Sequence, residues 1–123
     1  MAARRILIID DDDATVFGYE RYLSAEGFSV ESSDCLAEGL RKLGSKPFDA
    51  VVFDIRLPDG NALDIIPAVR AERVNTKIFV VSGLADAATE RTALAAGADD
   101  FFVKPLAVNE LCAGIAQSFE KGI

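Results

Sequence analysis

Histidine is absent from the 123-residue chain, and cysteine occurs only twice. Without histidine, the chain cannot carry a Ser-His catalytic pair, a zinc site of the usual kinds or a phosphohistidine of its own. Cys35 and Cys112 lie far apart and form no C-x-x-C pair, so neither metal nor redox chemistry is indicated. We expect both to be small packed residues. Any chemistry must therefore depend on carboxylates, hydroxyls, lysine and a metal ion.

Positive charge and long apolar runs are also scarce. The chain has 13 Lys and Arg against 20 Asp and Glu, a net charge of −7, which argues against direct contact with nucleic acid or an anionic membrane. No apolar run approaches the roughly 18 residues of a transmembrane helix. The N-terminal apolar stretch, Ile6-Leu7-Ile8-Ile9, ends in acid and is too short for a signal peptide. We expect a cytoplasmic protein without membrane or nucleic-acid partners.

Half of the residues are apolar, which argues against a disordered chain. A length of 123 residues suits one domain, whose hydrophobic core is large enough to be stable without disulfides or a structural metal. The sequence contains no linker, repeat or low-complexity segment. We therefore expect residues 1–123 to form a single domain.

Short apolar runs alternate with segments of helical periodicity. The runs predict strands at 5–9, 50–53, 77–81 and 101–103, and a weaker strand is predicted at 28–32. The periodic segments predict helices at 14–26, 36–43, 63–73, 87–96 and 108–119. Gly27 should end the first helix, and Pro67 should kink the third or shift its start. Such alternation predicts right-handed crossovers and an α/β fold with a parallel sheet covered on both faces.

Charged residues follow three of the predicted strands at the point where each one ends. Asp10-Asp11 follow the first strand, Asp54 the third and Lys104-Pro105 the fifth; Asp12 or Asp13 is expected to cap the first helix. The carboxyl ends of parallel strands form the crevice where ligands bind. Clustered carboxylates there favour a hard divalent metal, which leaves the lysine available for an anion. The pattern predicts a magnesium-assisted phosphoryl site with an aspartate nucleophile.

The ordered set of strand-end residues resembles the receiver domain of bacterial response regulators, the CheY-like family. The matching residues are Asp10-Asp11, Asp54, Ser82 and Lys104-Pro105, and the flanking segments 57–60 and 97–101 also resemble family signatures. The likeness covers essentially the whole chain. It implies a doubly wound, flavodoxin-like (βα)5 fold with strand order 2-1-3-4-5. It also implies a phospho-accepting signalling switch that catalyses only its own phosphorylation and dephosphorylation.

The resemblance assigns a phosphoacceptor and a metal site. Asp54 would attack a phosphohistidine on a sensor histidine kinase or phosphotransfer protein and become an acyl phosphate. Mg²⁺ would be bound by Asp11, Asp54, the backbone carbonyl of Arg56 and waters, with Asp10 reaching it through water.

Further roles follow for residues on the last two strands. Lys104 would pair with one phosphoryl oxygen and the Ser82 hydroxyl would bond another. Gly83 takes a place where a small residue such as alanine is usual, which keeps access to the phosphoryl group. Phe101 stands at the position of a rotating aromatic switch. Family resemblance also suggests a cis peptide between Lys104 and Pro105.

The resemblance further implies an output surface. In the family it is the face made by the fourth helix, fifth strand and fifth helix, here residues 87–96, 101–103 and 108–119. A downstream protein, which the sequence does not name, would bind this face. The phosphorylated form could also pair there with a second copy of the chain.

Two other functional hypotheses fit part of the sequence. Residues 11–15 satisfy D-x-D-x-T, the nucleophile motif of haloacid-dehalogenase-type phosphatases, in which Asp11 would be the nucleophile. In those enzymes, however, the lysine precedes the acidic pair, whereas Lys104 follows Asp99-Asp100, and Asp54 would have no role. An inactive receiver-like binding module would be expected to lack the phosphoacceptor, the acid pair or the lysine. The sequence has all three.

Overall fold

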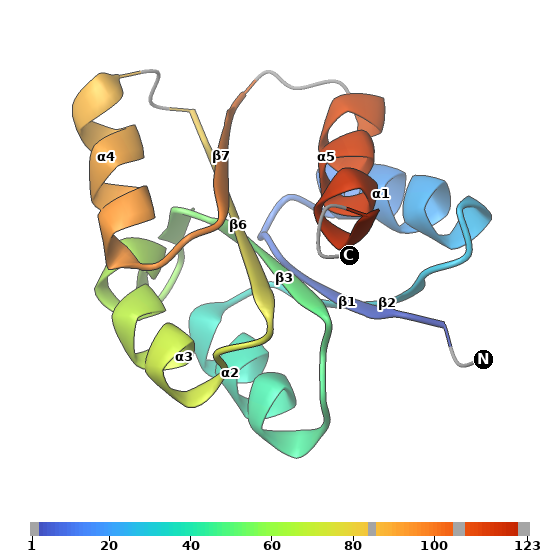
Figure 1. Cartoon of the computed structure of the whole chain (residues 1–123), viewed down its shortest axis with the longest axis horizontal. Coiled ribbons are helices and arrows are strands. Elements are labelled where there is room, and N and C mark those ends of the chain that lie inside the picture. The colour runs from blue at the N-terminus through green and yellow to red at the C-terminus, as the bar shows by residue number, and fades with distance from the viewer. Residues whose placement is uncertain (1–2, 84–85, 105–107, 121–123) are drawn as a thin grey trace.

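The computed structural model describes residues 3–83, 86–104 and 108–120, in which strands and helices alternate (Figure 1). Its elements in chain order are β1 (Arg5–Ile9), α1 (Asp13–Ala25), β2 (Ser29–Ser33), α2 (Leu36–Ser45), β3 (Ala50–Asp54), β4 (Arg56–Leu57), β5 (Gly60–Asn61), the 3-10 turn η1 (Ala62–Asp64), α3 (Ile66–Glu72), β6 (Lys77–Ser82), α4 (Ala87–Ala96), β7 (Asp100–Val103) and α5 (Val108–Glu120).

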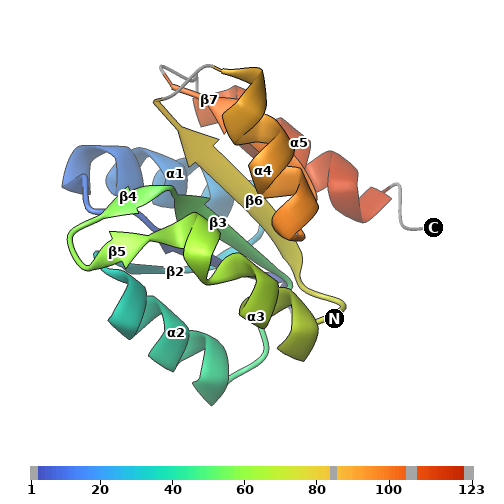
Figure 2. The same ribbon diagram turned by 90° about the vertical axis from the view of Figure 1, so that its left-hand side faces the viewer.

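Five strands form one sheet in the order β2-β1-β3-β6-β7, and every neighbouring pair is parallel. Since β6 and β7 are the fourth and fifth strands of this sheet, the order is the predicted 2-1-3-4-5. Helices α1 and α5 lie on one face, and α2, α3 and α4 lie on the other (Figures 1 and 2). The predicted doubly wound, flavodoxin-like fold is confirmed.

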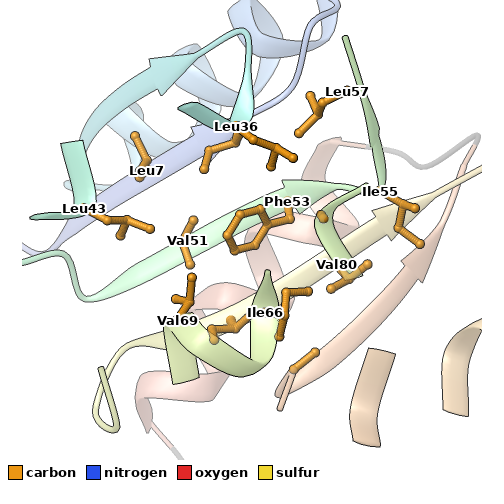
Figure 3. Packing of buried hydrophobic residues seen from close by; sticks show 14 of the residues in the cluster. Leu7, Leu36, Leu43, Val51, Phe53, Ile55, Leu57, Ile66, Val69 and Val80 are labelled. Carbon is orange, nitrogen blue, oxygen red and sulfur yellow. The ribbon is translucent and has the colours of Figure 1, made fainter. Parts of the chain in front are cut away.

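The two faces of the sheet carry separate halves of the core. Successive side chains of a strand point to opposite faces, so Ile8 of β1 packs towards α1 and α5, and Leu7 packs towards α2 and α3. The larger half surrounds Phe53, and we call it the Phe53 cluster (Figure 3). Strands buried on both faces are apolar along almost their whole length, which explains the apolar runs of β1, β3 and β6.

Local sequence signals set several helix ends. The Asp12 carboxylate accepts hydrogen bonds from the Thr15 amide and hydroxyl and caps α1, which confirms the predicted cap. Gly27 and Gly97 follow α1 and α4 with φ of +96° and +125°. Such backbone conformations favour glycine and end a helix.

The segment between β3 and α3 differs from the sequence prediction. Two short strands, absent from the predicted elements, form an antiparallel hairpin in which Arg56 pairs with Asn61 and Leu57 with Gly60, and residues 58–59 are its turn. The third helix begins at Ile66, after η1, instead of at residue 63. Pro67 lies in its first turn, where a missing N–H costs no helical hydrogen bond. The expected shift of the helix start is therefore confirmed.

Both cysteines are free thiols, Cys35 partly exposed and Cys112 buried. Burial raises the pKa of Cys112 to about 11, so this thiol stays protonated at neutral pH. Within the described ranges, no helix has both the length and the apolarity that a membrane crossing requires.

Candidate functional site

The parallel sheet brings the predicted site residues to one edge. Asp10 directly follows β1, Asp54 ends β3, Ser82 ends β6 and Lys104 directly follows β7. A backbone hydrogen bond of 2.7 Å from the Lys104 amide to the Ser82 carbonyl continues the pairing of β6 with β7. The residues are far apart in sequence, and the strand order alone makes them neighbours.

Three carboxylates converge at this edge. One oxygen from each of Asp10, Asp11 and Asp54 lies within 4.8 Å of the other two. Asp10 is 4% exposed, Asp54 is partly buried and Asp11 is exposed. The Asp10 Oδ1 atom accepts the Asp12 amide at 3.0 Å, which orients that carboxylate. Hard oxygen donors in this arrangement fit Mg²⁺, which keeps several waters and uses one or two protein carboxylates.

Lys104 reaches into the buried side of the cluster. Its Nζ atom lies 3.4 Å from Asp10 Oδ2 and 3.3 Å from Asp54 Oδ2. With all groups ionised, three carboxylates and one ammonium leave two negative charges. One divalent cation would neutralise this residual charge of two.

The surroundings shift the pKa values of both partners upward. Burial raises the pKa of Asp54, and the negative charge of Asp10 adds to this, while Lys104 acts in the opposite direction. Burial alone would lower the pKa of Lys104, but the attraction of Asp10 and Asp54 outweighs it, so the net shift is upward. Asp54 is therefore a poorly solvated, relatively basic carboxylate beside a firmly protonated lysine.

An open pocket lies next to the Asp54 carboxylate. It is lined by Asp54, Ile55, Arg56, Ser82 and Gly83. A Cβ placed on Gly83 would meet nothing within 4 Å, so this residue leaves space for a group approaching Asp54. Ser82 is buried in the pocket wall, with 2% of its surface exposed.

The hairpin determines which way the Arg56 backbone faces. The Ala62 amide donates to the Ile55 carbonyl at 2.8 Å, and Arg56 opposes Asn61 one residue further along. Hydrogen-bonded and non-hydrogen-bonded pairs alternate in an antiparallel ladder, so the Arg56 carbonyl points away from β5. Its side chain is exposed and makes no ion pair with any described residue.

Two predicted features lie at the margin of the site or beyond what is described. Phe101 of β7 is partly buried and packs against the Phe53 cluster, so its ring already contacts the core on the α4 side. The predicted cis peptide involves Pro105, which lies outside the described residues.

Comparison with known protein families identifies the family of this chain. A model of the response regulator receiver domain family matches residues 6–116. The chain belongs to this family. Receiver domains are signalling domains of two-component systems, where response regulators take phosphoryl groups from histidine kinases, and they bind Mg²⁺ at an acidic cluster like the one here.

Relatives extend over nearly the whole chain. It is 37% identical over 114 residues to the acid tolerance regulatory protein ActR of Rhizobium meliloti, covering 93% of this chain and 59% of ActR. It is 35% identical over 111 residues to the cell cycle transcriptional regulator CtrA of Caulobacter vibrioides, covering 90% of this chain and 48% of CtrA. The chain thus spans about half the length of these curated relatives.

Solved structures share the fold. A CheY-like receiver domain protein from Methanospirillum hungatei superposes with a TM-score of 0.91 at 32% identity, covering 97% of this chain and 95% of that one. A response regulator protein from Burkholderia pseudomallei, solved with a phosphorylated aspartic acid, a calcium ion and citrate, superposes with a TM-score of 0.83 at 26% identity. The superposition covers 95% of this chain and 72% of that one.

Proposed function

We propose that residues 1–123 form one receiver domain in which Asp54 accepts a phosphoryl group from a partner histidine kinase or phosphotransfer protein. The observation that carries this proposal is the convergence of Asp10, Asp11 and Asp54 within 4.8 Å, with Lys104 bridging the two more buried carboxylates. A phosphorylated aspartic acid in the superposable Burkholderia protein adds support.

The chemistry is a displacement at phosphorus. An Asp54 carboxylate oxygen attacks from the open pocket, the new P–O bond forms, and the P–N bond to the donor histidine breaks with its electron pair left on the imidazole. Lys104 turns from the carboxylates to one phosphoryl oxygen, and the Ser82 hydroxyl binds another. Mg²⁺, held by Asp11, Asp54 and the Arg56 carbonyl, with Asp10 acting through water, would neutralise charge on the transferring group.

The geometry favours this function over the two others. A dehalogenase-type phosphatase with Asp11 as nucleophile would give Asp54 no role, yet Asp54 contacts Lys104 and lies with Asp10 and Asp11. An inactive binding module would gain nothing from a half-buried lysine between two carboxylates, an arrangement with a desolvation cost.

Output is proposed to pass through the face formed by α4, β7 and α5. Leu94 and Val103 are apolar residues on these elements with 43% and 39% of their surface exposed, which suits a protein partner or a second copy of the chain. Movement of Ser82 towards the phosphoryl group, with a change at Phe101, would alter this face.

Phosphoryl incorporation tests the proposal. The chain incubated with acetyl phosphate and Mg²⁺ should gain one phosphoryl group by intact mass, and Asp54→Asn should gain none. Asp49→Asn is the matched control, because Asp49 precedes β3 at its opposite end and accepts the Arg5 amide. Equal incorporation into Asp54→Asn and the unchanged protein would contradict the assignment.

A further inference from the structure

Helix α2 lacks a capping side chain of its own. Its N-cap residue, Cys35, accepts no side-chain hydrogen bond from the first turn, whereas Asp12 and Asp86 cap α1 and α4 from the adjacent position. The first N–H groups of any helix have no partner inside that helix and need an acceptor from elsewhere. For α2, the acceptor comes from a distant part of the chain.

That acceptor is Asp59, at the turn of the β4–β5 hairpin. Its Oδ1 atom accepts the Leu36 amide at 2.8 Å, and its Oδ2 atom accepts the Ala37 amide at 2.9 Å. The hydrogen bond from the Ala37 amide, and after it the one from the Leu36 amide, hold the pKa of Asp59 below its ordinary value. A carboxylate at a helix N-terminus also interacts favourably with the helix dipole. At neutral pH, an ionised Asp59 thus joins the hairpin to α2.

Apolar contacts strengthen the same junction. A Cβ on Gly60 would lie 3.2 Å from Leu36 Cδ1, so the hairpin backbone rests against the first residue of α2. Leu36 and Leu57 are both buried in the Phe53 cluster, where Figure 3 shows them near each other above Phe53. The hairpin is therefore held to α2 by polar and apolar contacts together.

Helix α2 is in turn fixed against β1. A Cβ on Gly39 would lie 2.4 Å from Ile9 Cδ1, which shows that the helix backbone rests directly on Ile9. Ile9 immediately precedes Asp10 and Asp11. One side of α2 thus contacts the strand that presents these two acids, and its N-terminus contacts the hairpin that follows Asp54.

We infer that Asp59 is a positioning residue for the phosphoryl site: acting through α2, its carboxylate sets where the Arg56 carbonyl lies relative to Asp10 and Asp11. The inference rests on the function proposed above. Two-residue strands make few hydrogen bonds of their own, and an isolated hairpin is marginal in water. Removal of Asp59 should release the hairpin and displace the Arg56 carbonyl, although it deletes none of the groups proposed to bind metal or phosphoryl.

Mg²⁺ binding by the unphosphorylated protein measures this effect without any transfer reaction. In a titration followed by amide NMR, Asp59→Ala should weaken Mg²⁺ binding about tenfold, the lower end of what loss of an outer partner of a metal ligand causes. Hydrogen exchange at Leu36 and Ala37 should accelerate. Asp86→Ala is the matched control, because it removes the local carboxylate cap of α4 and should leave Mg²⁺ affinity unchanged.

A second variant separates positioning from simple helix capping. Cys35 has the extended backbone of an N-cap residue, with φ −151° and ψ 164°, so Cys35→Asp in the Asp59→Ala background gives α2 a cap of its own. Thermal stability should recover in this double variant, and Mg²⁺ affinity should not.

Two outcomes would overturn the inference alone. One is Mg²⁺ affinity in Asp59→Ala equal to that of the unchanged protein, and the other is recovery of affinity together with stability in the double variant. An unchanged protein that binds no Mg²⁺ and takes no phosphoryl group would overturn the proposed function as well, so the two failures are distinguishable.

Discussion

Asp54 and Lys104 show how the environment of single residues sets the electrostatics of the site. Asp54 is partly withdrawn from water and lies beside Asp10, so its negative charge is poorly stabilised. Lys104 contacts both carboxylates and compensates for only part of their charge. A divalent cation or a rearranged lysine is needed for the rest. The site thus has an electrostatic reason to bind Mg²⁺.

The raised pKa of Asp54 predicts a pH dependence of stability. In the interval between the ordinary aspartate pKa and the raised one, the folded state binds more protons than the unfolded state, so metal-free protein loses stability as pH rises. Asp54→Asn should therefore unfold at a higher temperature than the unchanged protein at about pH 7. The difference should shrink near pH 4, about where an ordinary aspartate titrates.

Thermal unfolding followed by circular dichroism, in buffer with a chelator, measures this difference. Asp59→Asn is a control in which the change in Tm should have the opposite sign. The hydrogen bonds to α2 lower the pKa of Asp59, so the ionised carboxylate stabilises the fold and the Asp59→Asn protein should unfold at a lower temperature. A lower Tm for Asp54→Asn at neutral pH would mean that pairing with Lys104 outweighs burial and repulsion.

Loss of the lysine should have a different signature. Lys104→Met keeps the apolar stem but leaves the buried Asp10 without its cationic partner, which should destabilise the metal-free protein by about 1–3 kcal/mol. Added Mg²⁺ should recover much of this loss because it supplies positive charge to the same carboxylates. Urea unfolding with and without Mg²⁺ tests this. A Mg²⁺ response no larger than that of the unchanged protein would contradict it.

At the scale of elements, α2 packs closely against the sheet, with Gly39 resting on Ile9 of β1. Gly39→Ala would place a methyl group 2.4 Å from Ile9 Cδ1 and 2.9 Å from its Cγ1. We expect a loss of about 1–3 kcal/mol from overpacking, despite the better helix propensity of alanine.

Gly44 in the same helix provides the matched control. A Cβ there would meet nothing within 4 Å, so Gly44→Ala should stabilise the protein by up to about 0.5–1 kcal/mol. Denaturant midpoints of the two variants should move in opposite directions. Equal shifts would show that α2 does not rest on Ile9 as closely as described.

Elements with a strong pattern could be predicted from the sequence, and weakly patterned ones could not. The aliphatic run of β1 and the capping aspartate of α1 are local signals, and the structure has both as expected. The hairpin at Arg56–Asn61 has strands of two residues each, too short for any periodicity. The capping of α2 by Asp59 joins positions 22 and 23 residues apart, and the only sequence hint is the absence of an acceptor at Cys35.

For the whole molecule, strand alternation was enough to predict the parallel sheet and the edge where the site forms, and the resemblance to receiver domains implied the strand order. Parallel strands with right-handed crossovers leave few possible topologies, so Asp10, Asp54 and Lys104 could be placed at one edge before any geometry was known. Individual side-chain contacts could not be predicted from the sequence. The bridging of two carboxylates by Lys104, the contact of Phe101 with the Phe53 cluster and the packing of Gly39 on Ile9 depend on distances in the folded chain.

The site of phosphorylation tests the account most directly. After reaction with acetyl phosphate and Mg²⁺, borohydride reduction converts an aspartyl phosphate to a stable alcohol that tandem mass spectrometry can locate. Trypsin separates the two candidate nucleophiles, because Asp54 falls in the peptide 43–56 and Asp11 in the peptide 6–21. We predict that the modified residue is Asp54 and that Asp49 in the same peptide is unmodified. Modification at Asp11 would contradict the receiver mechanism and favour the phosphatase reading.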